Sequence, residues 1–412
     1  MEALEGLHSP RLIALQKSLT QESETQGFWQ EIEAEGTPLV ESAGNDQFLV
    51  TLLWRDQQAS KRDKITCSMG GLLNSRSMAH SLFQLGDSDI WYRTYQLPAT
   101  VRATYHFFVN NEPVSDPLSK HTLHVPPDEV SVFLDKEMHL GIVELPAAPP
   151  EIPWLELKQE TPRDILHSQL FSSSTVGHDY RLAVYTPYNY HADNDPYPLL
   201  LLYDTWTYTE VIPASTLLDN LIAAGAIPPL VAVLFGHLCR KDRMQEMGFY
   251  EPFFTCVMQE LLPYIQQHYA ITRDPALSIV AGASMGGIAA MYTGLRHPER
   301  FGNIYSHTGS FHSGPPTERA YQRLEREIQQ RALVPQRFYL DVGMLERDEM
   351  GHGSPDGGPN AIQSNRFIRD VLRARGYDVT YTEYPGGHDL LWAPATLAQA
   401  LLDLTTPFLW VS

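Results

Sequence analysis

The segment 279–287, with the sequence IVAGASMGG, constrains the fold of this chain more than any other. It contains a G-x-S-x-G motif in which Gly282 and Gly286 flank Ser284. An apolar, strand-forming run precedes the motif and the apolar stretch 288–292 follows it, which predicts a strand, a sharp turn and a helix. Side chains at the two glycine positions would clash with the strained backbone of such a turn. In this context the motif predicts a nucleophilic Ser284, and the alternative is an incidental serine in a glycine-rich turn.

Strands alternate with helices on both sides of this motif. Two runs, 197–203 and 230–235, are continuously apolar, as in strands that are buried on both faces of a sheet. The other strands predicted in this region are 180–185, 277–281, 337–342 and 378–384. The helices predicted between them are 253–268, 288–296 and 360–375. This alternation predicts an α/β fold with a mostly parallel sheet and, with the serine turn included, a domain of the α/β-hydrolase type.

The first 145 residues have a different pattern, which is typical of antiparallel β-structure. Short strand-forming runs are separated by turn residues, and these runs are 48–54, 89–97, 104–109, 122–125 and 130–134. One short helix is predicted around 9–19, and a further helical turn at 27–31. The pattern predicts an antiparallel sandwich of about 100 residues.

A proline-rich segment, 145–153 (LPAAPPEIP), separates the two patterns. Four prolines in nine residues exclude a helix or a central strand, so the segment is predicted to be a semi-rigid extended linker. We therefore expect two domains, residues 1–150 and residues 151–412. At about 100–200 residues per domain, the length of 412 residues allows two or three.

Composition narrows the class of protein. The chain has 30 Lys and Arg against 49 Asp and Glu, and it lacks basic clusters, which argues against a nucleic-acid partner. It has no apolar run of about 18 residues, so we expect no transmembrane helix and no membrane partner. Its N-terminus does not have the pattern of a secretory signal, and its three cysteines, at 67, 239 and 256, have no disulfide-type or metal-type spacing. We therefore expect a cytoplasmic protein.

A nucleophilic serine needs a general base, and His388 is the predicted one. In α/β-hydrolases the order along the chain is serine, acid and histidine, with the histidine after the last strand. His388 lies in the sequence YPGGHD, directly after the predicted strand 378–384. The glycines allow the loop to fold the imidazole back towards the sheet edge.

The acid is expected after the preceding strand, where several carboxylates compete. Glu346, three residues past a glycine, is best placed to reach an imidazole, and Asp348 is the alternative. Asp341 lies inside the predicted strand and would point along or away from the cleft. Asp389 adjoins His388 and could orient it only through an awkward local contact. The alternative to a catalytic role is that Glu346 or Asp348 is an ordinary charged residue on the protein surface.

Two backbone amides are predicted to form the oxyanion hole. Met285 follows the nucleophile at a helix N-terminus, where its N–H can stabilise a negative charge. The second donor normally comes from the loop after an early buried strand, which predicts the amide of Thr205 or of Trp206. The Trp206 side chain could instead line the acyl or aryl pocket or simply cap the domain.

A local excess of positive charge follows the predicted strand 230–235. The sequence CRKDRMQEMG carries three basic residues, including Arg243, in a chain of net charge −19. Because the carboxyl ends of parallel strands face the cleft, these residues would suit an anionic substrate. A solvated polar loop is the alternative.

Several motifs together resemble the enterochelin (enterobactin) esterase family, and the resemblance spans nearly the whole chain. In the second domain it rests on GASMGGIAAMYTGLRHPERFGNIYSHTGSF, RMQEM, FFTCVMQELLPYI and YPGGHDLLW. In the first domain it rests on GFWQEIEAEGTPLVE, FLVTLLWRD and DPL. G-x-S-x-G is shared by many hydrolases, but its combination with R-x-x-E-[LM], GGHD and this N-terminal pattern is much more specific.

The resemblance implies a serine esterase that opens the trilactone of ferric catecholate siderophores such as ferric enterobactin and releases iron in the cell. It also implies an all-β, immunoglobulin-like sandwich before an α/β-hydrolase domain. Carried over residue by residue, it makes Ser284 the nucleophile, His388 the base and Glu346 the acid. Arg243 and Glu246 match the family's Arg-x-x-Glu and would contact the substrate.

Trp206 and Trp392, which ends the GGHDLLW motif, are the other predicted substrate contacts. The implied reaction needs no metal site and no cofactor in the protein, because iron arrives as part of the siderophore. Two other functions stay open at this point. One is an esterase of the same architecture that acts on another acyl or aryl ester, and the other is a catalytically inert protein that binds a siderophore or glycan.

Overall fold

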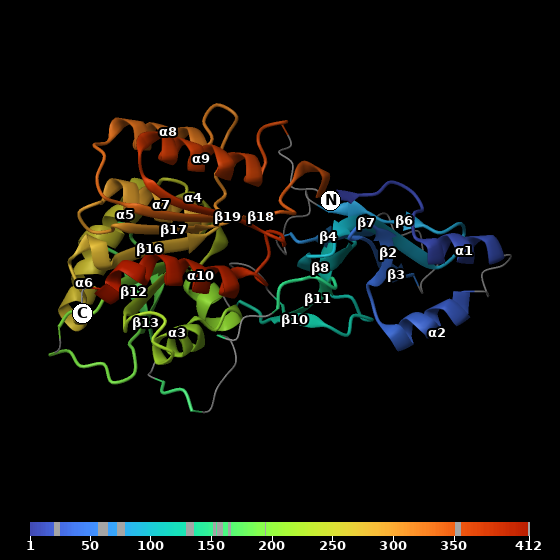
Figure 1. Cartoon of the computed structure of the whole chain (residues 1–412), viewed down its shortest axis with the longest axis horizontal. Coiled ribbons are helices and arrows are strands. Elements are labelled where there is room, and N and C mark those ends of the chain that lie inside the picture. The colour runs from blue at the N-terminus through green and yellow to red at the C-terminus, as the bar shows by residue number, and fades with distance from the viewer. Residues whose placement is uncertain are drawn as a thin grey trace.

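The computed structural model describes residues 1–19, 25–56, 65–71, 79–128, 136–150, 154, 160–163, 166–193, 195–350 and 356–410. Two segments discussed above lie wholly or partly outside the described residues: the predicted strand 130–134 and the last three residues of the predicted linker, 151–153. The described chain forms two antiparallel sheets beside a larger mixed sheet that is layered with helices (Figure 1).

The two antiparallel sheets contain the strands of the N-terminal region. One has the order β1-β7-β3-β2, with β6 paired to β7, and the other has the order β10-β11-β8-β4-β5, with β9 paired to β8. The bounds are β1 Glu2–Ala3, β2 Leu39–Gly44, β3 Gln47–Arg55, β4 Ile65–Met69, β5 His80–Ser81, β6 Phe83–Gln84, β7 Ile90–Pro98, β8 Arg102–Val109, β9 Glu112–Val114, β10 Thr122–Val125 and β11 Met138–Glu144. The predicted strands of this region that are described correspond to β3, β7, β8 and β10.

The two sheets share one apolar core, because side chains alternate between the two faces of each strand. Leu52 of β3 and Phe107 of β8 meet in this core, although they belong to different sheets. Leu53, on the other face of β3, packs against α1 (Pro10–Ser18) and α2 (Thr25–Glu35). Both helical segments predicted in this region are therefore present. They cover the outer face of the first sheet, so the region is a sandwich with two added helices rather than all-β.

The larger sheet has eight strands in the order β12-β13-β15-β14-β16-β17-β18-β19. β13 pairs antiparallel with β12 and with β15, and the other pairs are parallel. The bounds are β12 Leu166–Ser172, β13 Asp179–Tyr185, β14 Leu199–Tyr203, β15 Val231–His237, β16 Ser278–Ala283, β17 Asn303–His307, β18 Arg337–Gly343 and β19 Asp378–Tyr384. The sheet is mostly parallel, as the alternation predicts, and β12 and β17 are the strands that were not predicted.

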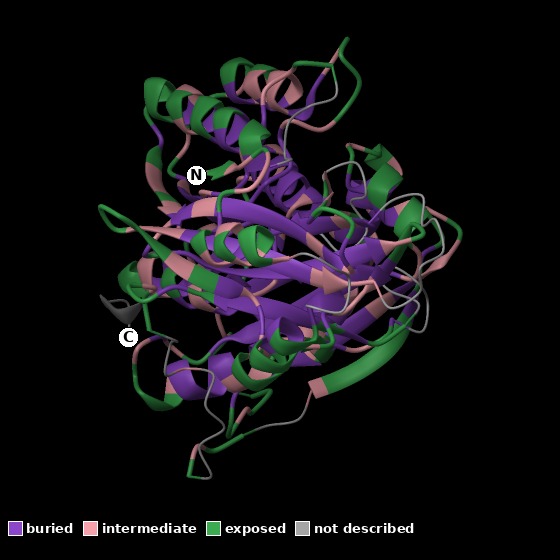
Figure 2. Cartoon of the chain, turned by 90° about the vertical axis from the view of Figure 1, so that its right-hand side faces the viewer, coloured by how far each residue is buried: buried purple, intermediate pink, exposed green. Residues whose placement is uncertain are grey.

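Helices cover both faces of this sheet (Figure 1). One face carries α5 Glu251–Cys256, α6 Leu262–His268, α7 Met285–Arg296, α8 Ala320–Gln330 and α9 Ala361–Arg375, and the other carries α3 Ala214–Ala223 and α10 Ala393–Thr405. Leu201 of β14 packs into the first layer and Leu202 into the second, so both faces of the strand are buried. Figure 2 shows the strands largely buried and the outward faces of several helices exposed.

The carboxyl ends of the parallel strands face the sandwich. The turn after β14 packs against β10 and β11, and the loop after β19 is hydrogen-bonded to β8 and to the residue that follows β4. Every predicted catalytic residue follows one of these strands, so the candidate site lies beside the sandwich. Within the described ranges, no helix is both long enough and apolar enough to cross a membrane.

Candidate active site

Ser284 occupies the sharp turn between β16 and α7. Its torsions, φ 59° and ψ −117°, lie outside the regions that residues other than glycine usually adopt. A Cβ atom at Gly282 would lie 2.4 Å from the carbonyl oxygen of Gly286, and one at Gly286 would lie 3.0 Å from Asp204 Oδ2. The predicted backbone clash is therefore present at Gly282, whereas at Gly286 an added Cβ would be tight against a side chain instead. The turn leaves Ser284 half-buried at the carboxyl edge of the sheet.

The two amides predicted for the oxyanion hole lie at this edge. Met285 is the first residue of α7, so its N–H has no acceptor within the helix and lies at the positive end of the helix dipole. Thr205 follows β14, the neighbour of β16, and comes directly after Asp204, whose φ is 76°. A Cβ atom at Gly236 would lie only 2.6 Å from the Thr205 amide nitrogen, so this glycine lets β15 approach the turn.

His388 and Glu346 form a buried pair. The Nδ1 atom of His388, in the loop after β19, lies 2.6 Å from Glu346 Oε2, in the turn after β18. Glu346 Oε1 accepts hydrogen bonds from the Gly343 N–H at 2.9 Å and from the Thr308 hydroxyl. A carboxylate at Nδ1 favours the tautomer that leaves Nε2 as a proton acceptor. Nε2 of His388 is buried and has no hydrogen-bond partner among the described residues.

The other candidate acids lie elsewhere. Asp348 is exposed, in a short 3-10 turn after Glu346. Asp341 is buried within β18, as predicted, and hydrogen-bonds to His307. Asp389 points its carboxylate at backbone N–H groups. Of the four carboxylates considered, Glu346 is therefore the one in contact with the imidazole of the predicted base.

Ser284 has a second serine as its neighbour. Its Oγ lies 2.9 Å from Ser310 Oγ, and the Ser310 N–H donates to the Ser284 carbonyl oxygen at 3.1 Å. Across the described ranges, no hydrogen bond joins Ser284 to His388. Such bonds are often long in a free enzyme and tighten when substrate binds. The unpartnered Nε2 of His388 is the atom that would receive the serine proton.

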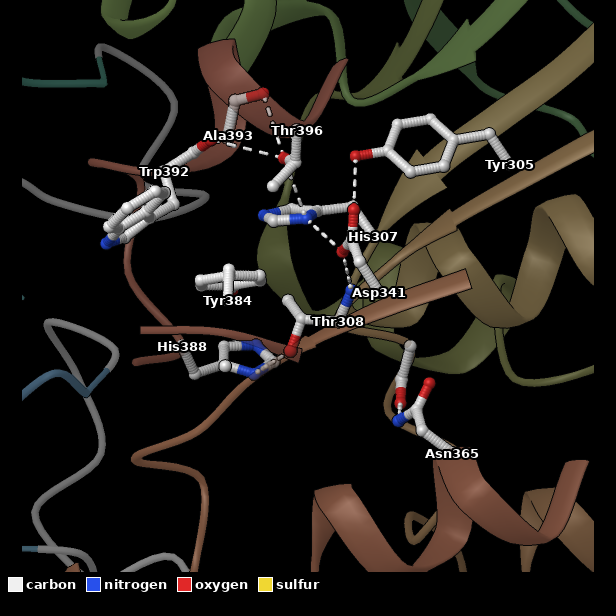
Figure 3. A network of polar contacts seen from close by, with 12 residues as sticks. Tyr305, His307, Thr308, Asp341, Asn365, Tyr384, His388, Trp392, Ala393 and Thr396 are labelled. Atoms are coloured by element: carbon white, nitrogen blue, oxygen red, sulfur yellow. Dashed lines mark hydrogen bonds and ion pairs between the residues drawn. The ribbon is translucent and has the colours of Figure 1, made fainter. Parts of the chain in front are cut away.

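Thr308 lies at the centre of the polar contacts shown in Figure 3. Its hydroxyl donates to Glu346. The same hydroxyl lies 3.2 Å from His388 Nδ1. Its φ of 42° is a genuine outlier for a β-branched residue. The Thr308 N–H is held by Asp341, through the carbonyl oxygen at 2.9 Å and through Oδ1 at 3.2 Å. This backbone geometry directs the hydroxyl at both members of the predicted acid–base pair.

Asp341 also forms a second buried histidine–carboxylate pair, with His307. His307 Nδ1 lies 2.6 Å from Asp341 Oδ1, and the Tyr305 hydroxyl donates to Oδ2 at 3.0 Å. Burial is the largest single influence and lowers the pKa of His307, but the carboxylates of Asp341, Glu346 and Asp389 together raise it by more, so the pKa lies above its usual value. The pair lies beside the Thr308 turn and is part of the same network of polar contacts (Figure 3).

Arg243, a predicted substrate contact, forms a buried two-pronged ion pair with Asp204. Its Nε and Nη2 atoms each lie 2.6 Å from one oxygen of the carboxylate. This bidentate geometry fixes the orientation of both groups. Because Asp204 directly precedes Thr205, the pair ties α4 (Arg240–Glu246) to the predicted oxyanion turn. The ion pair gives Arg243 a structural role. Contact between Arg243 and a substrate stays a prediction.

Glu246, the second predicted residue of this motif, is also buried and engaged. It accepts a hydrogen bond from the Tyr180 hydroxyl at 2.6 Å, and it lies 2.9 Å from His237 Nε2 and 3.3 Å from His178 Nε2. These partners come from β13, β15 and the turn before β13. Glu246 therefore joins α4 to the antiparallel edge of the sheet, and its predicted substrate contact remains untested.

The two predicted tryptophans both contact the sandwich. Trp206 is buried in an apolar cluster with residues of β10 and β11, such as Val125. The indole N–H of Trp392 donates to the Arg102 carbonyl oxygen at 2.7 Å, and the Arg102 N–H donates to the Pro385 carbonyl oxygen at 3.0 Å. This packing accounts for both side chains without a ligand. Their predicted role in substrate binding stays a prediction.

The sandwich also holds the backbone of the predicted base. The N–H of His388 donates to the carbonyl oxygen of Gly70, just beyond β4, at 2.7 Å. A Cβ atom at Gly387 would lie 2.0 Å from the same oxygen, so the close approach of the two backbones requires a glycine at this position. No larger residue fits at position 387 without moving the histidine loop away from the sandwich.

Asp389 adds a second link of this kind. Its Oδ2 accepts a hydrogen bond from the Thr104 N–H of β8 at 3.1 Å, and its Oδ1 accepts one from Leu391 at 3.0 Å. Burial raises the pKa of Asp389 to about 6, although both N–H bonds favour the charged form. The side chain that follows the predicted base thus bridges the two parts of the chain.

Family models match both parts of the chain. Residues 173–404 match the family described as putative esterase, and residues 49–154 match the family described as enterochelin esterase, N-terminal. The first match covers more than half of the chain. The chain belongs to the putative esterase family. The second match confirms the predicted resemblance to enterochelin esterases, and the protein is a carboxylic ester hydrolase.

This esterase is similar to curated relatives along almost its whole length. It is 26% identical over 410 residues to the iron(III) enterobactin esterase of Escherichia coli O6:H1, which covers 93% of this chain and 97% of that one. It is 25% identical over 405 residues to the iron(III) enterobactin esterase of Dickeya dadantii, which covers 89% of each chain. The solved enterobactin esterase of Shigella flexneri, crystallised in the presence of enterobactin, matches with a TM-score of 0.71 and 24% identity, over 95% of this chain and 100% of that one.

Three residues of the esterase site were not singled out from the sequence: Thr308, Ser310 and Gly70. The first two lie in the SHTGS run, which starts with the last two residues of β17 and continues past the strand at the carboxyl edge of the sheet. A polar run at that edge is a usable signal, but β17 itself was not predicted. The sequence around Gly70 does not indicate its role, because that role comes from a contact with a residue more than 300 positions away.

Proposed function

We propose that this esterase hydrolyses the ester bonds of a ferric catecholate siderophore, with the trilactone of ferric enterobactin as its reference substrate. The proposal rests on the combination of the site's geometry with the similarity of the whole chain to known esterases. A strained serine turn and a buried His388–Glu346 pair lie in a chain that resembles iron(III) enterobactin esterases across both of its parts. Each relative's name supplies the substrate class, and the residues of this chain supply the chemistry.

In the proposed mechanism, Ser284 Oγ attacks the carbonyl carbon of a seryl ester while His388 Nε2 takes the hydroxyl proton. The amides of Met285 and Thr205 stabilise the negative charge that develops on the carbonyl oxygen. The ester bond breaks, and His388 returns its proton to the departing alkoxide. Water then attacks the acyl carbonyl carbon while His388 Nε2 takes its proton. The bond between that carbon and Ser284 Oγ breaks, His388 returns the proton to Oγ, and the acyl group leaves as a carboxylic acid.

The remaining residues have supporting roles in this mechanism. Glu346 holds His388 through Nδ1 and stabilises the imidazolium that forms in each step. Arg243 braces the oxyanion turn through Asp204, and we propose that its positive charge also favours the anionic ferric catecholate. Trp206 and Trp392 join the sandwich to the carboxyl edge of the large sheet, and we propose that their rings also contact a catechol of the substrate.

Three finer statements belong to the same proposal. The protein needs no cofactor of its own, because acyl transfer to serine uses only protein groups and the iron is part of the substrate. The reaction takes place in the cytoplasm. The sandwich is of the immunoglobulin-like class, which its two antiparallel sheets around one core support.

The proposal is tested by incubating the full chain with ferric and iron-free enterobactin and following the products by liquid chromatography–mass spectrometry. We expect linear trimer, dimer and monomer to form in succession, and we expect Ser284→Ala to abolish their formation while still binding the ferric siderophore. A panel of acetyl and feruloyl esters serves as the comparison. Efficient turnover of a panel ester without turnover of either siderophore would replace the proposed substrate with another acyl or aryl ester.

A further inference from the structure

Three side chains of metal-ligand type gather beside the β10–β11 strand pair, on the face opposite the one that packs against Trp206. His124 of β10 and His139 of β11 face each other directly in the antiparallel register. Glu137 directly precedes β11, and its carboxylate lies beside both imidazoles. All three residues are exposed. In the part of the chain that the structure describes, this is the one group of three or more His, Cys, Asp or Glu side chains with donor atoms close enough to share an ion.

The distances between the donor atoms are close to those of a coordinated ion. His124 Nε2 lies 2.8 Å and His139 Nε2 lies 3.5 Å from the same oxygen of Glu137, and the three donor atoms all lie within 4.8 Å of one another. Zn²⁺ binds imidazole nitrogen and carboxylate oxygen at about 2.0–2.2 Å, so tetrahedral ligands lie roughly 3.3 Å apart. Small side-chain rotations would therefore bring all three donors to one ion.

The strand pair that carries the two histidines is firmly held. Its inner face packs against Trp206 through Val125, Met138 and Leu140, all of which are buried. The His139 N–H donates to Ser115 Oγ at 3.0 Å, which ties β11 to a third segment of the sandwich. Donors on a rigid support bind an ion with less loss of conformational freedom than donors on a loop.

We propose that His124, Glu137 and His139 form a surface site for a divalent first-row transition-metal ion, with Zn²⁺ as the best match. Two imidazoles and one carboxylate are a donor set that Zn²⁺ favours, and three protein ligands leave a fourth position for water or an outside ligand. The net charge of −19 adds a general attraction for cations. The site is independent of the proposed siderophore hydrolysis, and it provides the sandwich with a binding function of its own.

The test is a titration of the tag-free full chain with Zn²⁺ by isothermal calorimetry, with the bound metal counted after equilibrium dialysis. We expect one Zn²⁺ per chain. His124→Ala, His139→Ala and Glu137→Gln should each weaken binding by about tenfold or more, and the double variant His124→Ala/His139→Ala should lose it. Because all three side chains are exposed, each variant should keep the unfolding temperature of the wild type.

His121→Ala is the matched control. His121 is an exposed histidine just before β10, and its Nδ1 lies 3.8 Å from Glu144 Oε2, so it offers a histidine and a carboxylate but no third donor. This variant should bind Zn²⁺ with wild-type affinity. The proposal is overturned if the wild type binds no stoichiometric Zn²⁺ at micromolar concentrations. It is equally overturned if the double variant binds as the wild type does.

Discussion

At the scale of single residues, Thr308 brings the predicted acid, the predicted base and a strained backbone together. Its hydroxyl contacts Glu346 and His388, and its φ of 42° is maintained by Asp341. Strain of this kind persists only where the surrounding structure enforces it. We therefore assign Thr308 a positioning role: it orients the carboxylate that orients the imidazole.

Thr308→Val tests this role, because valine keeps the β-branched shape and removes only the hydroxyl. A hydrogen bond to a charged group contributes about 1.5–3 kcal/mol, so we expect kcat to fall by roughly ten- to hundredfold with KM little changed. Thr308→Ser, which restores the hydroxyl, should recover most of the activity. The pH profile of kcat should shift in the valine variant and return in the serine variant. Wild-type kcat and an unshifted profile in Thr308→Val would exclude the role.

At the scale of elements, the short helix α4 supports the predicted oxyanion turn through one buried ion pair. Arg243 contacts both oxygens of the Asp204 carboxylate, and a Cβ atom at Gly286 of the serine turn would lie close to the same carboxylate. The helix, the turn after β14 and the serine turn therefore depend on one another. From the sequence, Arg243 was expected to face the substrate, and the ion pair gives it a structural role as well.

Arg243→Met distinguishes the structural role of Arg243, in the ion pair with Asp204, from its predicted role in substrate binding. If the structural role is the main one, the variant leaves the Asp204 charge buried without its partner. The free energy of unfolding should then fall by about 3–5 kcal/mol in urea titrations. Arg240→Met, in the same helix but exposed, is the control and should change stability by less than about 0.5 kcal/mol. Wild-type stability of Arg243→Met together with a raised KM would assign Arg243 to the substrate alone.

Asp389, in the loop after β19, should make the free energy of unfolding depend on pH. Its pKa of about 6 lies above that of an exposed aspartate, so the folded chain holds the proton to higher pH than the unfolded chain does. The resulting stabilisation is complete below about pH 4 and is lost as the pH rises through 6. Between pH 5 and pH 7.5 the wild type should lose roughly 1 kcal/mol relative to Asp389→Asn. Unfolding measured at both pH values checks this, and a difference that does not change with pH would contradict it.

At the scale of the whole molecule, the sandwich contacts the loop that carries the predicted base. It holds His388 through the Gly70 carbonyl oxygen, Asp389 through the Thr104 amide, and Trp392 through the Arg102 carbonyl oxygen. All of these contacts reach the same short loop. The position of the base therefore depends on the docking of the two parts of the chain.

Gly387→Ala tests this dependence in the full chain. The added methyl group would collide with the Gly70 backbone and displace the histidine loop, and misplacement by about 1 Å can cost roughly a hundredfold in rate. We expect kcat to fall by ten- to a hundredfold while binding of the ferric siderophore persists. Gly27→Ala is the control, because a Cβ atom there meets nothing within 4 Å, and its kinetics should match the wild type. Equal kcat values for the two variants would show that contact with the sandwich does not affect the catalytic geometry.

The sequence was most informative where local pattern decides the structure. Apolar runs predicted strands such as β14 and β15, and G-x-S-x-G with GGHD predicted the positions of Ser284 and His388. The short β17 was missed, because its sequence NIYSH mixes polar and apolar residues although every one of them is buried. Contacts between the two parts of the chain could not be predicted, since Gly70 and Trp206 acquire their roles only when distant segments meet.

In the proposed reaction, Ser284, activated by His388, is the nucleophile of a siderophore esterase. Labelling with a fluorophosphonate probe, with and without ferric enterobactin, tests this role, and peptide mass spectrometry locates the adduct. We expect one adduct on Ser284, which ferric enterobactin prevents from forming and which His388→Ala forms far more slowly. An adduct on another residue, or labelling of Ser284 that ferric enterobactin leaves unchanged, would contradict it.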